Sequence, residues 1–154
     1  MEEIKTLVLD VDGVLTDGKL YMGAGGEKMF KAFHTRDVRA IREFIARGFE
    51  VVLITADAWP GIKCFAEKVG AELIVERNKS TIVAGINGPF MMVGDDVWDA
   101  SLMKLAEYLF APRNCDQALK MLDGIEILDI NGGDGVVAEL LNRLIITNRL
   151  CVLS

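Results

Sequence analysis

The sequence has few cysteines and a shortage of basic residues. Its three cysteines, Cys64, Cys115 and Cys151, are scattered and show no CxxC spacing. Such a set predicts reduced thiols, as in a cytoplasmic protein, and argues against disulfides or a cysteine zinc site. Lysine and arginine number 17 against 23 aspartates and glutamates, which gives a net charge of −6 at pH 7. That balance argues against a surface for nucleic acid or an anionic membrane.

Long apolar segments are also missing. No run approaches the roughly 18 residues that a membrane-spanning helix requires, and residues 1–5 lead directly into a short apolar strand without the pattern of a signal peptide. Of the 154 residues, 51% are hydrophobic and 26% are charged. We therefore expect one soluble domain, residues 1–154, with a sizeable core.

An acidic stretch close to the N-terminus organises the sequence. The apolar run Leu7–Leu9 is followed by Asp10, Asp12 and Gly13. An apolar run without alternation predicts a strand buried on both faces, as in a parallel sheet, with the two carboxylates just beyond its end. Two carboxylates so close repel each other unless one is protonated or a cation lies between them, and Mg²⁺ prefers oxygen ligands. The alternative is that both acids cap the next segment and Gly13 makes a turn.

Strand-like and helix-like segments alternate along the rest of the chain. The expected strands cover residues 6–9, 50–55, 72–75, 90–93, 108–111 and 125–128, and the expected helices cover 37–47, 60–69, 79–84, 100–107, 116–122 and 136–145. Segments 19–22 and 28–33 flank a glycine-rich turn and predict a β-hairpin. The alternation predicts an α/β fold with a doubly wound parallel sheet.

Polar residues gather at or just after the ends of the predicted strands. They are Asp10, Asp12, Thr55, Asp95, Asp96 and Asp99. The carboxyl ends of parallel strands meet at one edge of the sheet, so these side chains should converge, and Lys79 is the best placed cation to balance them. Acids that hold a metal, together with a nucleophilic carboxylate, a hydroxyl and a lysine, suit phosphoryl transfer.

Four motifs carry a family resemblance. In order, they are DVDGVLTDG at residues 10–18, LIT at 53–55, a lysine within Asn78-Lys79-Ser80, and GDDVWD at 94–99. Together they resemble the motifs of the haloacid dehalogenase superfamily of phosphatases. The stretch from Asp10 to Asp37 resembles more narrowly the small, capless branch that contains the 3-deoxy-D-manno-octulosonate 8-phosphate phosphatases. The glycine-rich segment 131–137 is similar to the C-terminal segment of that branch.

The resemblance implies the roles of the acids. Asp10 would be the nucleophile that becomes an aspartyl phosphate, and Asp12 would protonate the leaving oxygen and then activate the hydrolytic water. The carboxylates of Asp10 and Asp95 and the backbone carbonyl of Asp12 would bind Mg²⁺, with Asp96 or Asp99 supporting them from behind.

The resemblance also implies how the phosphate is held. Thr55 and the amide of Ala56 would bind phosphate oxygens, and Lys79 would pair with both the phosphate and Asp10. Arg36, Arg39 and Arg77 are candidates for binding an anionic substrate, although exposed salt bridges would explain them equally well. The implied activity is Mg²⁺-dependent hydrolysis of a small phosphorylated metabolite, such as a sugar or sugar-acid phosphate.

The spacing of the motifs leaves no room for an inserted cap domain. A hairpin and one helix already occupy the interval from Asp10 to Thr55, and the interval from Thr55 to Lys79 is shorter still. The branch closes its open sites by forming a homotetramer with its hairpins packed together. Apolar hairpin residues such as Leu20 and Met22 fit such an interface, and they fit equally well a hairpin that covers its own sheet.

Several positions depart from the branch's usual pattern. Glycine and arginine usually follow the threonine of the second motif, and here Ala56 and Asp57 follow Thr55. A carboxylate in place of an arginine argues against the same contact to a sugar acid. The altered positions leave two alternatives open, which are a non-catalytic oligomerisation or regulatory domain and a phosphotransferase that uses the same aspartyl phosphate.

Overall fold

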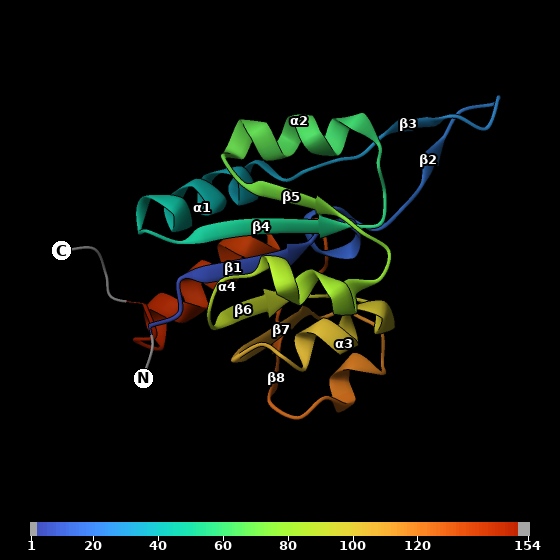
Figure 1. Cartoon of the computed structure of the whole chain (residues 1–154). Helices are drawn as coiled ribbons and strands as arrows, with labels where there is room; N and C mark the ends of the chain where they lie inside the picture. Colours follow the sequence, from blue (N-terminus) through green and yellow to red (C-terminus); the bar gives the residue numbers. More distant parts are fainter. Residues whose placement is uncertain (1–2, 151–154) are drawn as a thin grey trace.

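The computed structural model describes residues 3–150, so Cys151 lies outside the described residues. A six-stranded sheet, entirely parallel, has the strand order β5-β4-β1-β6-β7-β8 (Figure 1). Its strands are β1 (Thr6–Asp10), β4 (Glu50–Thr55), β5 (Glu72–Val75), β6 (Phe90–Val93), β7 (Tyr108–Pro112) and β8 (Ile125–Leu128). The predicted doubly wound α/β fold is confirmed.

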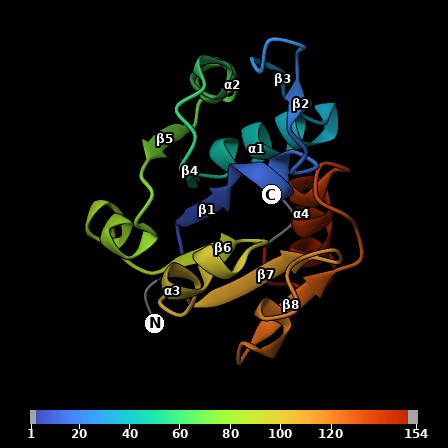
Figure 2. The ribbon, with the colours of Figure 1, turned by 90° about the vertical axis from the view of Figure 1, so that its right-hand side faces the viewer.

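Helices cover both faces of the sheet. They are α1 (Thr35–Ala46), α2 (Pro60–Val69), α3 (Ala100–Met103) and α4 (Val136–Ile146), with the 3-10 helices η2 (Lys79–Gly85), η3 (Val97–Asp99) and η4 (Leu119–Met121). Figure 2 looks onto one edge of the sheet and shows α1 and α4 on one side and α3 on the other. Among the helices within residues 3–150, none has the length and apolar character needed to cross a bilayer.

The strands divide their side chains between two apolar cores because successive residues point to opposite faces. Leu7 and Leu9 pack with α1, α2 and α4, whereas Val8 packs with α3 and η2. All five residues of β1 are buried. This explains why the strand is apolar at consecutive positions up to the carboxylate at its end.

Strand β1 lies where the direction of winding reverses. The chain runs outward from β1 to β4 and β5, then returns to β6 on the other side of β1 and continues to β7 and β8. In open parallel sheets, ligands bind outside the carboxyl ends of the strands at such a reversal. Asp10 is the last residue of β1 and therefore stands at this point, next to the ends of β4 and β6.

A β-hairpin projects beyond the same edge of the sheet (Figure 1). Its strands, β2 (Tyr21–Met22) and β3 (Lys28–Phe30), are shorter than predicted and form a separate antiparallel pair. The rings of Tyr21 and Phe30 stack with centroids 4.6 Å apart. Leu20, Met22, Met29 and Phe30 are exposed, so in the isolated chain these side chains do not cover its own sheet.

Three predicted helices are shorter or tighter than expected. Segment 79–85 is a 3-10 helix, and its consecutive β-branched residues Thr81–Val83 disfavour an α-helix. Helix α3 ends at Met103 because the amide of Glu107 already bonds to the carbonyl of Phe90 in β6. Segment 116–122 forms only the turn η4, in which the amides of Leu119 and Lys120 bond three residues back to the carbonyls of Asp116 and Gln117, as in a 3-10 helix.

Asp37 links the first and last helices. Its side chain is buried in α1, and its Oδ1 accepts hydrogen bonds from the amides of Val137 at 2.9 Å and Ala138 at 3.1 Å, in the first turn of α4. Burial raises the pKa of Asp37 to about 6, and these amides oppose the shift. The contact fixes the start of α4 and with it the glycine-rich segment that precedes this helix.

Candidate active site

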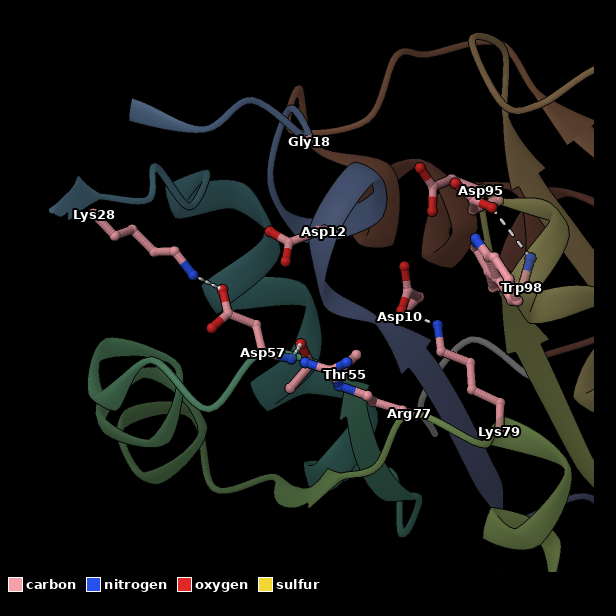
Figure 3. Close-up of a pocket in the computed structure, with 12 residues that line it drawn as sticks. Asp10, Asp12, Gly18, Lys28, Thr55, Asp57, Arg77, Lys79, Asp95 and Trp98 are labelled. Atoms are coloured by element: carbon pink, nitrogen blue, oxygen red, sulfur yellow. Dashed lines mark hydrogen bonds and ion pairs between the residues drawn. The ribbon is translucent and has the colours of Figure 1, made fainter. Parts of the chain in front are cut away.

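A cavity of about 720 Å³ lies at the carboxyl edge of the sheet (Figure 3). Asp10 enters it from β1, Thr55 from β4, and Lys79 from the start of η2, while Asp95 follows β6. The lining residues are Asp10, Asp12, Gly18, Lys28, Thr55, Ala56, Asp57, Arg77, Lys79, Asp95, Asp96 and Trp98. The predicted convergence of polar residues at one sheet edge is therefore observed.

Lys79 is the central cation of the cavity. Its Nζ donates to Asp10 Oδ1 at 2.7 Å and also to Asp99 Oδ1. Burial works against the charged form of Lys79, but the carboxylates of Asp10 and Asp99 outweigh it and raise the pKa of the lysine. Lys79 is thus a fixed positive charge beside the oxygen atoms of Asp10.

Asp99 is fully buried behind the cavity. While Oδ1 accepts from Lys79, Oδ2 accepts from the amides of Asp95 at 2.9 Å and Asp96 at 3.1 Å. The side chain of Asp96 in turn accepts from the amide of Trp98. Asp99 therefore holds both the lysine and the loop that carries Asp95, and Asp96 caps the turn η3.

Three carboxylates meet closely enough to share a cation. One oxygen from each of Asp10, Asp95 and Asp99 lies within 4.8 Å of the others. Burial, together with repulsion from Asp99, raises the pKa of Asp10 well above its usual value, although Lys79 opposes the shift. Burial also raises the pKa of Asp95 to about 6, and contact with Asp10 opposes it. These acids need more positive charge than Lys79 supplies if all are to ionise at neutral pH.

The free oxygen atoms identify which acids could bind a metal. Asp95 Oδ1 is buried and has no hydrogen-bond partner, whereas both oxygens of Asp99 are occupied by Lys79 and amides. An all-oxygen donor set suits a hard divalent cation such as Mg²⁺. The chemistry of the site therefore fits a divalent metal held by Asp10 and Asp95, with Asp99 supporting them.

Asp12 lies on the loop η1 (Val11–Leu15), across the cavity from Lys79 (Figure 3). Its Oδ1 accepts from Thr16 Oγ1 at 3.0 Å and from Lys31 Nζ at 2.6 Å. Lys31 also lies 3.1 Å from Asp57 Oδ2, which pairs with Lys28 as well. The hairpin strand β3 and the residue that follows it are thereby tied to the cavity wall.

Close backbone packing of glycines shapes the loop η1 (Val11–Leu15), which carries Asp12 and is called the acid loop below. Gly13 has a φ of +87°, and a Cβ there would lie only 1.6 Å from Asp95 Oδ2. A Cβ on Gly132 would lie 1.9 Å from the carbonyl oxygen of Gly13, and the amide of Gly133 bonds to the carbonyl of Val14 at 3.0 Å. Asp95 and the glycine-rich segment, both far from it in the sequence, therefore support the loop that carries Asp12.

The loop after β4 lines the side of the cavity near Asp12. Thr55 Oγ1 accepts from the amide of Asp57 at 3.0 Å, and Asp57 Oδ1 accepts from the amide of Trp59 at 2.9 Å. Hydrogen bonds from Lys28 and Trp59 lower the pKa of Asp57 against the effect of burial. Asp57 thus forms ion pairs with the hairpin, a role that the departure from the family pattern did not predict.

Most of the predicted site residues lie at the cavity, but Arg36 does not. Asp10, Asp12, Thr55, Ala56, Lys79, Asp95 and Asp96 line the cavity, and Asp99 lies behind it. Arg36 is exposed in the first turn of α1 and is not among the lining residues. Sequence reasoning missed Lys28 and Lys31, whose one signal was their position within the stretch that carries the family resemblance.

Comparison with known proteins identifies the family. No protein-family model matches the chain. The 3-deoxy-D-manno-octulosonate 8-phosphate phosphatase KdsC of Salmonella typhi is 30% identical, over 94% of this chain and 81% of the relative. A structure described as a putative phosphatase of the same kind from Vibrio cholerae has a TM-score of 0.86 and 28% identity, covering 98% of this chain and 89% of its own. The structure of the cobalt-bound deoxy-D-mannose-octulosonate 8-phosphate phosphatase from Haemophilus influenzae has a TM-score of 0.84 and 25% identity. The match covers 96% of this chain and 90% of the Haemophilus chain.

The fold and the relatives define an α/β phosphatase, that is, a phosphoric monoester hydrolase. More narrowly, the chain belongs to the family of 3-deoxy-D-manno-octulosonate 8-phosphate phosphatases, within the haloacid dehalogenase (HAD) superfamily that also names a 26% identical structure from Legionella pneumophila with a TM-score of 0.84.

Proposed function

We propose that this protein is a Mg²⁺-dependent phosphatase that hydrolyses a sugar or sugar-acid phosphate through an aspartyl phosphate on Asp10. The observation that carries the proposal is the pairing of Asp10 with Lys79 at 2.7 Å beside the unpartnered Asp95 oxygen, within one cavity. A carboxylate becomes an effective nucleophile when neighbouring positive charge keeps it ionised. The pairing also places a cation where the charge of the phosphate would lie.

The proposed reaction has two steps. An oxygen of Asp10 attacks phosphorus, the ester P–O bond breaks, and Asp12 gives its proton to the leaving oxygen. Asp12, now a carboxylate, then takes a proton from a water molecule that attacks the aspartyl phosphate, which releases phosphate and regenerates Asp10. Both acids line the same cavity, as this sequence of proton transfers requires.

The remaining residues of the cavity bind and orient the phosphate. Thr55 and the amide of Ala56 would donate to its oxygens, and Lys79 would pair with its charge. A divalent cation held by Asp10, Asp95 and the backbone carbonyl of Asp12 would neutralise the charge that develops on the phosphate oxygens. Support for a metal comes from the carboxylate cluster and from the cobalt-bound relative.

The names of the relatives and the charges of the cavity support the substrate class. The Salmonella relative is named for a sugar-acid phosphate. Arg77 lines the cavity in addition to Lys79, so the cavity offers a cation beyond the one assigned to the phosphate. Asp57 is paired with Lys28 and Lys31, and this pairing reduces the repulsion that its carboxylate would exert on an anionic substrate.

Phosphate release from a panel of sugar, sugar-acid, nucleotide and p-nitrophenyl phosphates tests the proposal. With Mg²⁺ we expect turnover of at least one sugar or sugar-acid phosphate, and with EDTA a loss of about 100-fold or more, because the carboxylates then repel the phosphate. Restoring Mg²⁺ should restore the rate, which controls for damage by the chelator. Phosphate release that EDTA does not affect would contradict the proposed metal requirement. The absence of release from any ester would contradict the proposed phosphatase activity.

We also propose that the protein is a homotetramer joined through its hairpins. The four apolar side chains Leu20, Met22, Met29 and Phe30 support this proposal, because each is at least half exposed in the isolated chain. Sedimentation equilibrium should give a mass four times that of the chain, and Met22→Glu with Met29→Glu should reduce it. A monomer for the unchanged chain would contradict the proposal.

A cytoplasmic location stays a prediction from the cysteines, of which Cys64 and Cys115 are free thiols.

A further inference from the structure

Lys31 links three parts of the cavity. It follows β3 of the hairpin, and its side chain is only 6% exposed. Its Nζ lies 2.6 Å from Asp12 Oδ1 and 3.1 Å from Asp57 Oδ2. Burial works against the ammonium form, but the hydrogen bonds and charges of Asp12 and Asp57 outweigh it and raise the pKa of Lys31. The lysine is therefore a cation held between the side chains of Asp12 and Asp57.

These contacts fix one oxygen of Asp12 and leave the other available. Lys31 and Thr16 both donate to Oδ1. No hydrogen bond to Oδ2 is recorded within residues 3–150, and Asp12 lines the cavity. Two donors on one oxygen restrict rotation of the carboxyl group, because turning it would break both bonds. The second oxygen is thereby held ready to exchange a proton with a group in the cavity.

Asp57 holds Lys31 from the opposite side. Its own carboxylate is fixed by the amide of Trp59 and by an ion pair with Lys28. Asp57 stands two residues after Thr55, so the same loop presents the phosphate-binding threonine and anchors the lysine. Lys31 contacts both Asp12 and Asp57, whereas Lys28 contacts only Asp57 of the two.

We propose that Lys31 is a positioning residue that orients Asp12 for proton transfer to the leaving oxygen, with Asp57 as its anchor. This inference rests on the proposed function, in which Asp12 is the general acid. An alkoxide leaving from a sugar phosphate needs that proton, whereas p-nitrophenolate leaves readily without it. The effect of Lys31 should therefore depend on the leaving group, which a general loss of fold or of substrate binding would not produce.

The test compares kcat/KM for p-nitrophenyl phosphate and for the alkyl phosphate that the unchanged enzyme hydrolyses fastest. This parameter reports the steps up to departure of the leaving group, when Asp12 acts as an acid. For Lys31→Met we expect a loss of about 100-fold on the alkyl ester and less than about 5-fold on the phenyl ester. Lys31→Arg, which keeps the charge and two donors, should recover most of the alkyl activity.

Two further variants separate orientation from charge and folding. Asp57→Asn leaves Asp12 and Lys31 intact but weakens the anchor, so it should show the same selective loss to a smaller extent. Lys5→Met, the matched control, makes the same chemical change at a lysine whose exposed ion pair with Glu3 lies away from the cavity, and it should leave the rates on both esters unchanged. Thermal unfolding checks that each variant is folded. If Lys31→Met is unfolded, the selective loss in Asp57→Asn decides.

The outcomes distinguish this inference from the proposed function. Equal losses on both esters for Lys31→Met, or no loss on either, would overturn the orienting role of Lys31 while the phosphatase stands. If the unchanged enzyme releases phosphate from no ester, the proposed function fails, and the role of Lys31 fails with it.

Discussion

Replacement of Asp10 by asparagine is expected to lower kcat for phosphate release by at least about 1,000-fold, because an amide cannot attack phosphorus to form the covalent intermediate. The substitution nearly preserves the shape of the side chain. It also removes one of three neighbouring acids, while Asp99 continues to pair with Lys79. We therefore expect the variant to fold with a melting temperature close to that of the unchanged enzyme, so that the lost activity reports chemistry alone.

The measurement is phosphate release at saturating Mg²⁺, together with thermal unfolding of the same preparations. Asp129→Asn is the control, because this substitution makes the same chemical change away from the cavity. Asp129 forms an exposed ion pair with Arg113. That control should retain full activity. If Asp10→Asn kept Mg²⁺-dependent activity comparable to that of the control, Asp10 could not be the nucleophile.

Replacement of Gly132 by alanine is expected to reduce the free energy of unfolding by about 3 kcal/mol and to impair catalysis as well. The new Cβ would lie 1.9 Å from the backbone carbonyl oxygen of Gly13. No side chain can rotate away to relieve this overlap, so the acid loop or the glycine-rich segment must shift. Either shift disturbs the position of Asp12 or that of Gly13 against Asp95.

Urea unfolding and phosphate release measure the two effects of this substitution. Gly85→Ala is the matched control, because a Cβ there would meet only Ile74 at an ordinary distance of 3.8 Å and Gly85 has no positive φ. It should change stability by less than about 1 kcal/mol. Equal stability of Gly132→Ala and Gly85→Ala would mean that the contact with Gly13 does not constrain the fold.

The sheet and the acidic centre were predictable because each depends on a local signal. Consecutive apolar residues that end in a polar one predicted β1, β4 and β6, and their order along the chain predicted that Asp10, Thr55 and Asp95 would meet. Lys79 follows the same logic, since it comes shortly after β5. At these positions the spacing of residues in the sequence determines their location in the fold.

The ion pairs of the hairpin could not be predicted in the same way. Whether Lys28 and Lys31 reach Asp57 depends on how the hairpin folds back over the cavity, which short strands with a shifted register do not determine from sequence. The length of α3 was likewise decided by a tertiary contact of a backbone amide, that of Glu107 with β6, rather than by helix propensity. Arg36 had no periodic pattern to place its side chain, and it lies on the surface.

The contact between the acid loop and the glycine-rich segment has a consequence for how the enzyme is made. The acid loop is synthesised long before the backbone that supports it at Gly132 and Gly133. A nascent chain that stops before this segment can pair β1 with β4 and β6 but cannot complete the loop. A competent catalyst therefore forms only after this segment has been translated, and a chain that stops before Gly132 carries all four motifs without a finished site.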